Sequence, residues 1–125
     1  MGLAKKDVEV LLARLIEEDY LNEERFAILF AGGHFRQKKW GKVKIIHALR
    51  QKRVSERNIK SGLKEIKEED YLPALRKLAQ TKWTSLKGEQ YISREAKTSA
   101  YLQQKGYERQ IIQDIIRQIR TKKED

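Results

Sequence analysis

The stretch Glu17-Glu18-Asp19-Tyr20-Leu21 returns without a change as Glu68-Glu69-Asp70-Tyr71-Leu72, 51 residues further along the chain. A second stretch, Leu49-Arg50-Gln51-Lys52, returns as Leu102-Gln103-Gln104-Lys105 at an offset of 53 residues. A sequence repeated at a fixed period is the signature of stacked supersecondary units. The two matches therefore predict tandem units of about fifty residues.

Each unit has the apolar spacing of helices. Ile45 and Leu49 fall on one side of a helix, four residues apart. Two further sets of apolar residues have helical spacing and correspond to each other at the offset of 53 residues. They are Ile59, Leu63 and Ile66, and Ile112, Ile116 and Ile119. No segment shows the strict alternation of apolar and polar residues that is typical of a strand. We therefore predict an all-α fold, with tandem three-helix repeats that form an elongated, curved array.

Turn and cap residues separate the predicted helices. Trp40-Gly41 predicts a turn, and Ser55 is a good N-cap for the helix that carries Ile59. In the second unit, Gly88 predicts the next turn, and Lys105-Gly106 predicts a helix C-terminus, because glycine readily takes the left-handed conformation found there.

The first forty residues predict two helices. Four apolar residues follow the i, i+3, i+4, i+7 pattern of one helical face: Val8, Leu11, Leu12 and Leu15. Asn22 predicts the N-cap of a second helix, because Glu23 and Glu24 follow it in the first turn. We expect that second helix to pack through Phe26, Leu29, Phe30 and Phe35.

The predicted organisation has three parts. Residues 5–20 match only the third helix of a unit, so we expect residues 1–21 to be the last helix of a first repeat that is otherwise truncated or lost. Residues 22–66 and 67–125 are each expected to form a three-helix repeat.

The positive charge is concentrated in the middle of the chain. The net charge is +10, and 37% of the residues are charged, against roughly 25% in an average soluble domain. Residues 36–64 carry eleven basic groups and one acidic group, whereas residues 1–35 and 65–125 have net charges of −3 and +3. A concentrated basic field attracts polyanions. The alternative is a solvated helical surface without a partner.

The basic segment supplies the predicted binding residues for nucleic acid or for a protein filament on it. These are Arg36, Lys38, Lys39, Lys42, Lys44, His47, Arg50, Lys52 and Arg53. With Ile45 and Leu49 facing inward, we expect Lys44, His47 and Arg50 to face outward and to track phosphates with little sequence preference. Trp40 could stack on a base or close the turn. An acidic protein surface would fit the same face.

The chain lacks the residue patterns of catalytic and metal sites. It has no cysteine, and its two histidines, His34 and His47, have no acidic residue at a metal-ligand spacing. Gly32-Gly33 lacks the context of a phosphate-binding loop. We therefore expect no catalytic residues, no metal and no cofactor. The short apolar stretches predict no membrane span, and residues 1–7 lack the apolar core of a signal peptide.

Three segments resemble, in order and spacing, the central signature of the RecX family. They are Tyr20-Leu21-Asn22-Glu23-Glu24-Arg25-Phe26-Ala27, Gly41-Lys42-Val43-Lys44-Ile45 and Leu49-Arg50-Gln51-Lys52-Arg53-Val54-Ser55. The segment Tyr101-Leu102-Gln103-Gln104-Lys105-Gly106-Tyr107 resembles the family's final unit. The similarity extends from about Val8 onward. It departs from the family pattern at Arg53, where the family usually has glycine.

The resemblance implies a regulator of homologous recombination and of the SOS response. Such a protein binds RecA filaments on single-stranded DNA and modulates, mostly inhibits, the ATPase, strand exchange and co-protease activities of RecA. Some members also bind DNA directly, so single-stranded and double-stranded DNA are both candidate partners of this chain. We accordingly expect a cytoplasmic, monomeric, non-enzymatic protein. The alternative is a general DNA-binding helical module without sequence preference and without an obligate protein partner.

Overall fold

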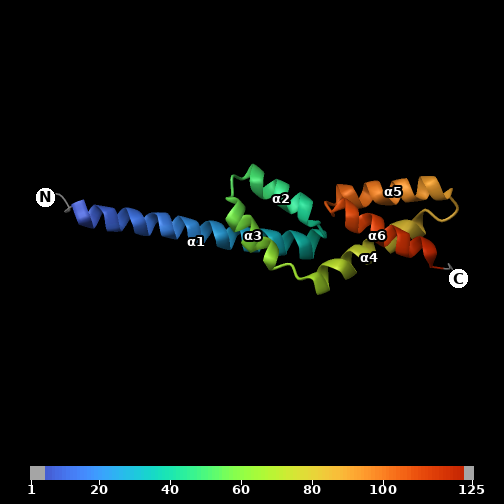
Figure 1. Cartoon of the computed structure of the whole chain (residues 1–125), viewed down its shortest axis with the longest axis horizontal. Coiled ribbons are helices and arrows are strands. Elements are labelled where there is room, and N and C mark those ends of the chain that lie inside the picture. Colours follow the sequence, from blue (N-terminus) through green and yellow to red (C-terminus); the bar gives the residue numbers. More distant parts are fainter. Residues whose placement is uncertain (1–4, 123–125) are drawn as a thin grey trace.

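Six α-helices make up the structure, a computed structural model that describes residues 5–122. The helices are α1 (Lys5–Lys38), α2 (Lys42–Gln51), α3 (Glu56–Lys64), α4 (Glu68–Ser85), α5 (Tyr91–Gln104) and α6 (Arg109–Thr121). No strand occurs within the described range, so the prediction of an all-α fold is confirmed. The helices form an elongated array, in which α1 extends from one end and α4, α5 and α6 form the other (Figure 1).

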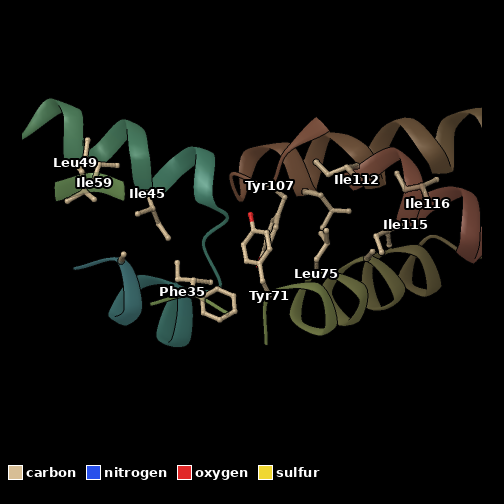
Figure 2. Close-up of a cluster of buried hydrophobic side chains, with 14 of the residues drawn as sticks. Phe35, Ile45, Leu49, Ile59, Tyr71, Leu75, Tyr107, Ile112, Ile115 and Ile116 are labelled. Atoms are coloured by element: carbon tan, nitrogen blue, oxygen red, sulfur yellow. The ribbon is translucent and has the colours of Figure 1, made fainter. Parts of the chain in front are cut away.

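The array has two three-helix groups. In the first group, α2 and α3 pack on α1 and on each other, and in the second group α4, α5 and α6 pack together. The predicted core positions of α2 and α3 are confirmed, because Ile45, Leu49 and Ile59 are buried. In α6, Ile112, Ile116 and Ile119 of the repeated pattern are also buried, and so is Ile115. Figure 2 shows Ile112, Ile115 and Ile116 in this cluster.

The helix break predicted at Asn22 is wrong. α1 runs from Lys5 to Lys38 without interruption, and Asn22 lies inside it. An N-cap needs an extended backbone, and neither glycine nor proline is present near Asn22 to end the preceding helix. Asparagine inside a helix costs only a few tenths of a kcal/mol relative to good helix formers, so the flanking residues keep the helix continuous.

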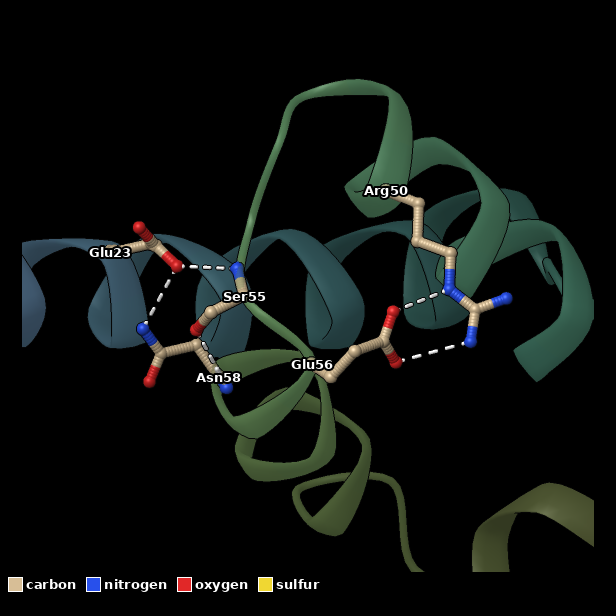
Figure 3. Close-up of polar contacts among 5 residues, drawn as sticks. All are labelled: Glu23, Arg50, Ser55, Glu56 and Asn58. Atoms are coloured by element: carbon tan, nitrogen blue, oxygen red, sulfur yellow. Dashed lines mark hydrogen bonds and ion pairs between the residues drawn. The ribbon is translucent and has the colours of Figure 1, made fainter.

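Glu23 caps a different helix from the one predicted. Its carboxylate accepts hydrogen bonds from the backbone N–H of Ser55 (2.6 Å) and from the side-chain amide of Asn58 (3.1 Å), at the N-terminus of α3 (Figure 3). The hydroxyl of Ser55 accepts from the Asn58 N–H, so the predicted N-cap is confirmed. Together the backbone bond from Ser55 and the bond from Asn58 lower the pKa of Glu23.

The buried face of α1 agrees with the prediction only in part, because Phe35 is buried and Phe30 packs against the core but two other predicted residues do not. Phe26 and Leu29, expected in the core, are 43% and 65% exposed, whereas Ala27 and Ala31 are fully buried. The reason is the close approach of α3. A Cβ on Gly62 of α3 would lie 2.7 Å from the carbonyl oxygen of Ala27, so only small residues fit between the two helices.

A backbone joint connects the two groups of helices. The N–H of Gly41 donates to the carbonyl of Lys105 (2.8 Å), and the N–H of Val43 donates to the carbonyl of Gly106 (2.9 Å). Gly106 has the predicted positive φ, at 97°. A Cβ on Gly106 would lie 2.2 Å from the Cβ of Lys44, so the joint requires glycine for its lack of a side chain as well as for its backbone conformation.

Tyr71 lies at the centre of this joint, between Phe35 and Tyr107 (Figure 2). Its hydroxyl accepts from the N–H of Lys42 (2.8 Å) and donates to the carboxylate of Glu108. Tyr71 is the tyrosine of the second copy of the repeated Glu-Glu-Asp-Tyr motif, and its ring contacts Phe35 of α1 and Tyr107. The first copy of the motif differs, because it lies inside the continuous helix α1.

The N-terminal half of α1 extends beyond α2 and α3 (Figure 1). Leu11, Leu12 and Leu15 of the predicted apolar face are exposed, and the side chain of Val8 lies outside the described residues. The boundary predicted at residue 21 does not coincide with a helix end. The assignment of residues 1–21 to a first repeat stays a prediction, as do the repeats at 22–66 and 67–125.

Candidate functional site

A ladder of aromatic rings runs along the surface where α1 meets the start of α2. Phe30 stacks on His34 with ring centroids 4.0 Å apart, and His34 lies 4.5 Å from the ring of Trp40. Phe26 extends the ladder, 5.7 Å from Phe30. Residues four apart on a helix share one face, and this spacing aligns the three rings of α1. Trp40 joins them because Lys39, with a φ of 58°, ends α1 and turns the chain back.

Three of the predicted cations lie over this ladder. The ammonium of Lys44 is 4.6 Å from the centroid of the Trp40 ring, and that of Lys38 is 5.7 Å from it. The ammonium of Lys52 lies 5.9 Å from the Phe30 ring. Such contacts position a cation without neutralising it. We call this surface the aromatic–lysine face: Phe30, His34, Lys38, Trp40, Lys44 and Lys52.

The lysines of the aromatic–lysine face keep their charge available. No carboxylate within residues 10–122 forms a salt bridge with Lys38, Lys44 or Lys52. Lys38 and Lys52 are exposed, whereas Lys44 is half-buried beside Trp40, so the expectation that Lys44 faces fully outward is corrected. The face therefore presents three positive charges beside aromatic carbon, an arrangement that suits phosphates next to flat or apolar groups.

Two other predicted cations are paired within the chain. The guanidinium of Arg50 binds both carboxylate oxygens of Glu56, at 2.7 and 3.1 Å (Figure 3). Hydrogen bonding to Arg50 lowers the pKa of the Glu56 carboxyl. The ammonium of Lys42 pairs with Glu68 at 3.3 Å and lies over the ring of Tyr71. Lys42 thus contributes to the joint between the two groups of helices.

The remaining four predicted residues, Arg36, Lys39, His47 and Arg53, do not gather in one cluster. Arg36 lies in a cleft whose lining includes Glu65, Glu69 and Asp70, so acidic groups surround it. His47 is exposed, near the Gln51 amide at 3.2 Å. Arg53 lies in the turn after α2 with a φ of 61°. The structure therefore separates the nine candidates into one cluster of three lysines and six residues with other surroundings.

Lys39 belongs to a second basic site that the sequence did not predict. Its cleft, of about 460 Å³, lies beside α4 and α5 and is also lined by Lys77, Lys82, Leu78 and Tyr101. Lys82 lies 5.2 Å from the ring centroid of Tyr101. The second group of helices therefore repeats, on a smaller scale, the combination of a lysine with an aromatic ring. No local sequence signal indicated this site, because α4 lines it together with Tyr101 of α5 and with Lys39, which follows α1.

The sequence predicted neither catalytic residues nor a metal site. Within the described residues, no group of three or more histidine, aspartate or glutamate side chains is arranged to hold a metal ion. His34 is occupied by ring stacking and by the carbonyl of Phe30 at 2.9 Å. None of the helices in the described range has the length and apolar character needed to cross a membrane.

Comparison with known families identifies both groups of helices. A model of the second three-helix domain of RecX matches residues 22–63, and a model of the third three-helix domain of RecX matches residues 68–116. The chain belongs to the RecX family. The RecX second-domain match contains all six residues of the aromatic–lysine face.

Individual RecX proteins extend this comparison. "Regulatory protein RecX" from Pelodictyon phaeoclathratiforme is 28% identical over 116 residues, which are 93% of this chain and 71% of the relative. The crystal structure of RecX from Lactobacillus salivarius matches with a TM-score of 0.74 over 95% of this chain and 77% of that chain. Its sequence identity is 18%, so this second match supports the fold.

Proposed function

We propose that this RecX-family chain regulates homologous recombination and the SOS response by binding RecA filaments on single-stranded DNA. Bound there, it restrains the ATPase, strand exchange and co-protease activities of RecA. The proposal rests on the family membership and on one observation. Three lysine ammoniums are grouped over stacked rings, and no carboxylate in the described part of the chain pairs with them. A filament of protein on DNA offers both phosphates and protein surface to such a face.

The chemistry of the aromatic–lysine face fits recognition without sequence preference. Lysine ammoniums bind phosphates as point charges, and neutralising a phosphate releases its condensed counterions. Beside this face, the exposed ring of Phe26, which adjoins Phe30, can contact a base or an apolar side chain of the partner. The helices carry these groups on a preformed surface, which reduces the ordering cost of binding.

The proposed mechanism is binding alone, by a protein without enzymatic activity that acts in the cytoplasm beside its partner. A regulator of this kind binds one state of the filament more tightly than another. A ligand can shift an equilibrium between two states only by the difference between its affinities for them. Inhibition of RecA ATPase follows if the chain binds more tightly to a filament state that hydrolyses ATP slowly.

A charge-reversal experiment tests the proposal. The double variant Lys38→Glu, Lys52→Glu changes two exposed members of the aromatic–lysine face, and Lys87→Glu, Arg109→Glu makes the same change in charge on the second group of helices. Each variant is titrated into RecA on single-stranded DNA while ATP hydrolysis is followed. We expect the first variant to need at least tenfold more protein for half-suppression, and the second to remain close to wild type.

Three results would contradict the proposal. Equal losses in both variants would mean that net charge, rather than the aromatic–lysine face, determines binding. Loss of binding to naked DNA with full retention of ATPase suppression would mean that RecA is contacted elsewhere. If wild-type protein bound DNA but left RecA activity unchanged, the alternative of a general DNA-binding module without a protein partner would be supported instead.

A further inference from the structure

The second group of helices carries an open cleft whose floor is the outer surface of its hydrophobic core. The cleft, of about 460 Å³, lies where α4 adjoins Tyr101 of α5. Three of its lining residues, Ala74, Leu78 and Tyr101, pack against the core but remain partly exposed. Ligand-binding clefts have volumes of about 300–1,000 Å³ and mostly apolar linings. The cleft therefore has room for an apolar group of a partner.

The lysines that line this cleft give it a positive charge. Lys39, Lys77 and Lys82 belong to its lining, which contains no aspartate or glutamate. No carboxylate within residues 10–122 forms a salt bridge with any of the three. Lysine lays its aliphatic stem along apolar surface and keeps its ammonium in water. The cleft thus combines an apolar floor with positive charges at its edge.

The ring of Tyr101 holds Lys82 at this edge. The ammonium of Lys82 lies 5.2 Å from the ring centroid, in a contact that positions the charge without neutralising it. Glu89 lies within the electrostatic range of Lys82, but its carboxylate is paired with Lys97 at 2.5 Å. Hydrogen bonding to Lys97 lowers the pKa of Glu89, and the charge of Lys82 adds to this effect more weakly. The charge of Lys82 therefore stays available to a partner.

An adjoining acidic cleft limits how far an anionic partner can extend. Lys39 and Ala74 line both clefts, and the lining of the adjoining one includes Glu65, Glu69 and Asp70. A nucleic acid carries a phosphate at every nucleotide, so a strand that ran from the lysines toward the first group of helices would meet these carboxylates. A short peptide segment can end, or change its charge, before it reaches them. The distribution of charge thus favours a peptide over a nucleic acid.

We propose that this cleft binds an acidic peptide segment of a partner protein. One bulky apolar side chain of the peptide lies between α4 and Tyr101, and flanking carboxylates lie beside Lys77 and Lys82. The carboxylates complement the lysines, and the apolar side chain covers Leu78 and Tyr101, which a phosphate backbone would leave exposed. The cleft is separate from the aromatic–lysine face, so this inference goes beyond the proposed function.

Fluorescence anisotropy with a labelled peptide tests the proposal. The probe is Asp-Glu-Phe-Leu-Glu-Asp with blocked termini. Two matched peptides replace either its apolar residues by alanine or its acidic residues by asparagine and glutamine. We expect the chain to bind the probe at least tenfold more tightly than either matched peptide. Failure to bind the probe, or equal affinity for the alanine peptide, would overturn the proposal.

Charge reversal locates the binding. Lys77→Glu, Lys82→Glu should weaken binding of the probe at least tenfold, because it places carboxylates beside those of the peptide. Lys87→Glu, Arg109→Glu makes the same change in charge at exposed positions of the same group of helices and should bind the probe like the wild type. Thermal unfolding shows that each variant is folded. Equal losses in the two variants would mean that net charge alone determines binding, which contradicts the proposal.

Two further measurements separate this cleft from a charged surface and from a nucleic-acid site. Ala74→Phe fills the cleft without changing its charge and should also weaken binding of the probe at least tenfold. Unchanged binding would show that no apolar side chain enters the cleft. Lys38→Glu, Lys52→Glu should bind the probe like the wild type, and an excess of oligothymidylate should not displace the probe from this variant. Loss of binding in this variant, or displacement by the oligonucleotide, would place the peptide on the aromatic–lysine face or assign the cleft to nucleic acid, and either result overturns the proposal.

Discussion

Replacement of Gly106 by alanine should destabilise the chain through the joint between its two groups of helices. Two costs add at this position. A non-glycine residue in the left-handed region costs about 1–2 kcal/mol. The added methyl also meets the Lys44 Cβ at 2.2 Å and its backbone N at 2.7 Å, and overpacking of this kind typically costs about 1–3 kcal/mol. We expect a total of roughly 2–5 kcal/mol.

Gly88 provides the matched control. Its φ is +99°, close to the +97° of Gly106, but a Cβ there would meet nothing within 4 Å. Gly88→Ala should therefore show the backbone cost alone, about 1–2 kcal/mol. Thermal unfolding followed by circular dichroism measures both variants, and for a chain of this size roughly 4 °C in Tm corresponds to 1 kcal/mol. Equal losses in Tm for Gly88→Ala and Gly106→Ala would refute the close packing described for the joint.

Three further predictions concern the core, the Glu23 cap and the charged surface. Leu49→Ala, at a fully buried side chain, should lower the free energy of unfolding by about 2–5 kcal/mol, measured by urea denaturation. Because the pKa of Glu23 is lowered in the folded chain, its contribution should be present above pH 4.5 and be lost as the pH falls through the lower folded value. Glu23→Gln should therefore weaken the dependence of Tm on pH in the acid range. An unchanged dependence would contradict the capping role of Glu23. Binding of naked single-stranded DNA through the three lysines of the aromatic–lysine face should give a slope of about −2 in log affinity against log salt, and a flat response would contradict those contacts.

Much of the fold could be predicted because its signals are local in sequence. The repeated motif and the spacing of Ile59 and Ile112 indicate tandem helical units. The turn at Trp40-Gly41, the cap at Ser55 and the positive φ of Gly106 depend on single residue types, and all three are confirmed. The continuity of α1 was missed, because Asn22 fits an N-cap but is also tolerated inside a helix.

The candidate site was predicted less completely, because pairing in space decides which cations are available. Arg50 is bound by Glu56 and Lys42 by Glu68, although the second pair is separated by 26 residues in sequence. Partners across helices cannot be found by reading charges along one segment. The ring ladder did leave a signal, since Phe26, Phe30 and His34 are spaced four residues apart, but Phe26 and Phe30 were assigned to the core instead.

The most direct test of the proposed function compares the affinity of the chain for single-stranded DNA with and without RecA. A fluorescent oligonucleotide is titrated with the chain alone, and then with RecA and a nucleotide that is not hydrolysed. We predict that the filament is bound at least tenfold more tightly than naked DNA, with Lys38→Glu, Lys52→Glu reducing this gain and Lys87→Glu, Arg109→Glu retaining it. Equal affinity for naked DNA and for the filament would contradict the proposal that a RecA filament is the partner.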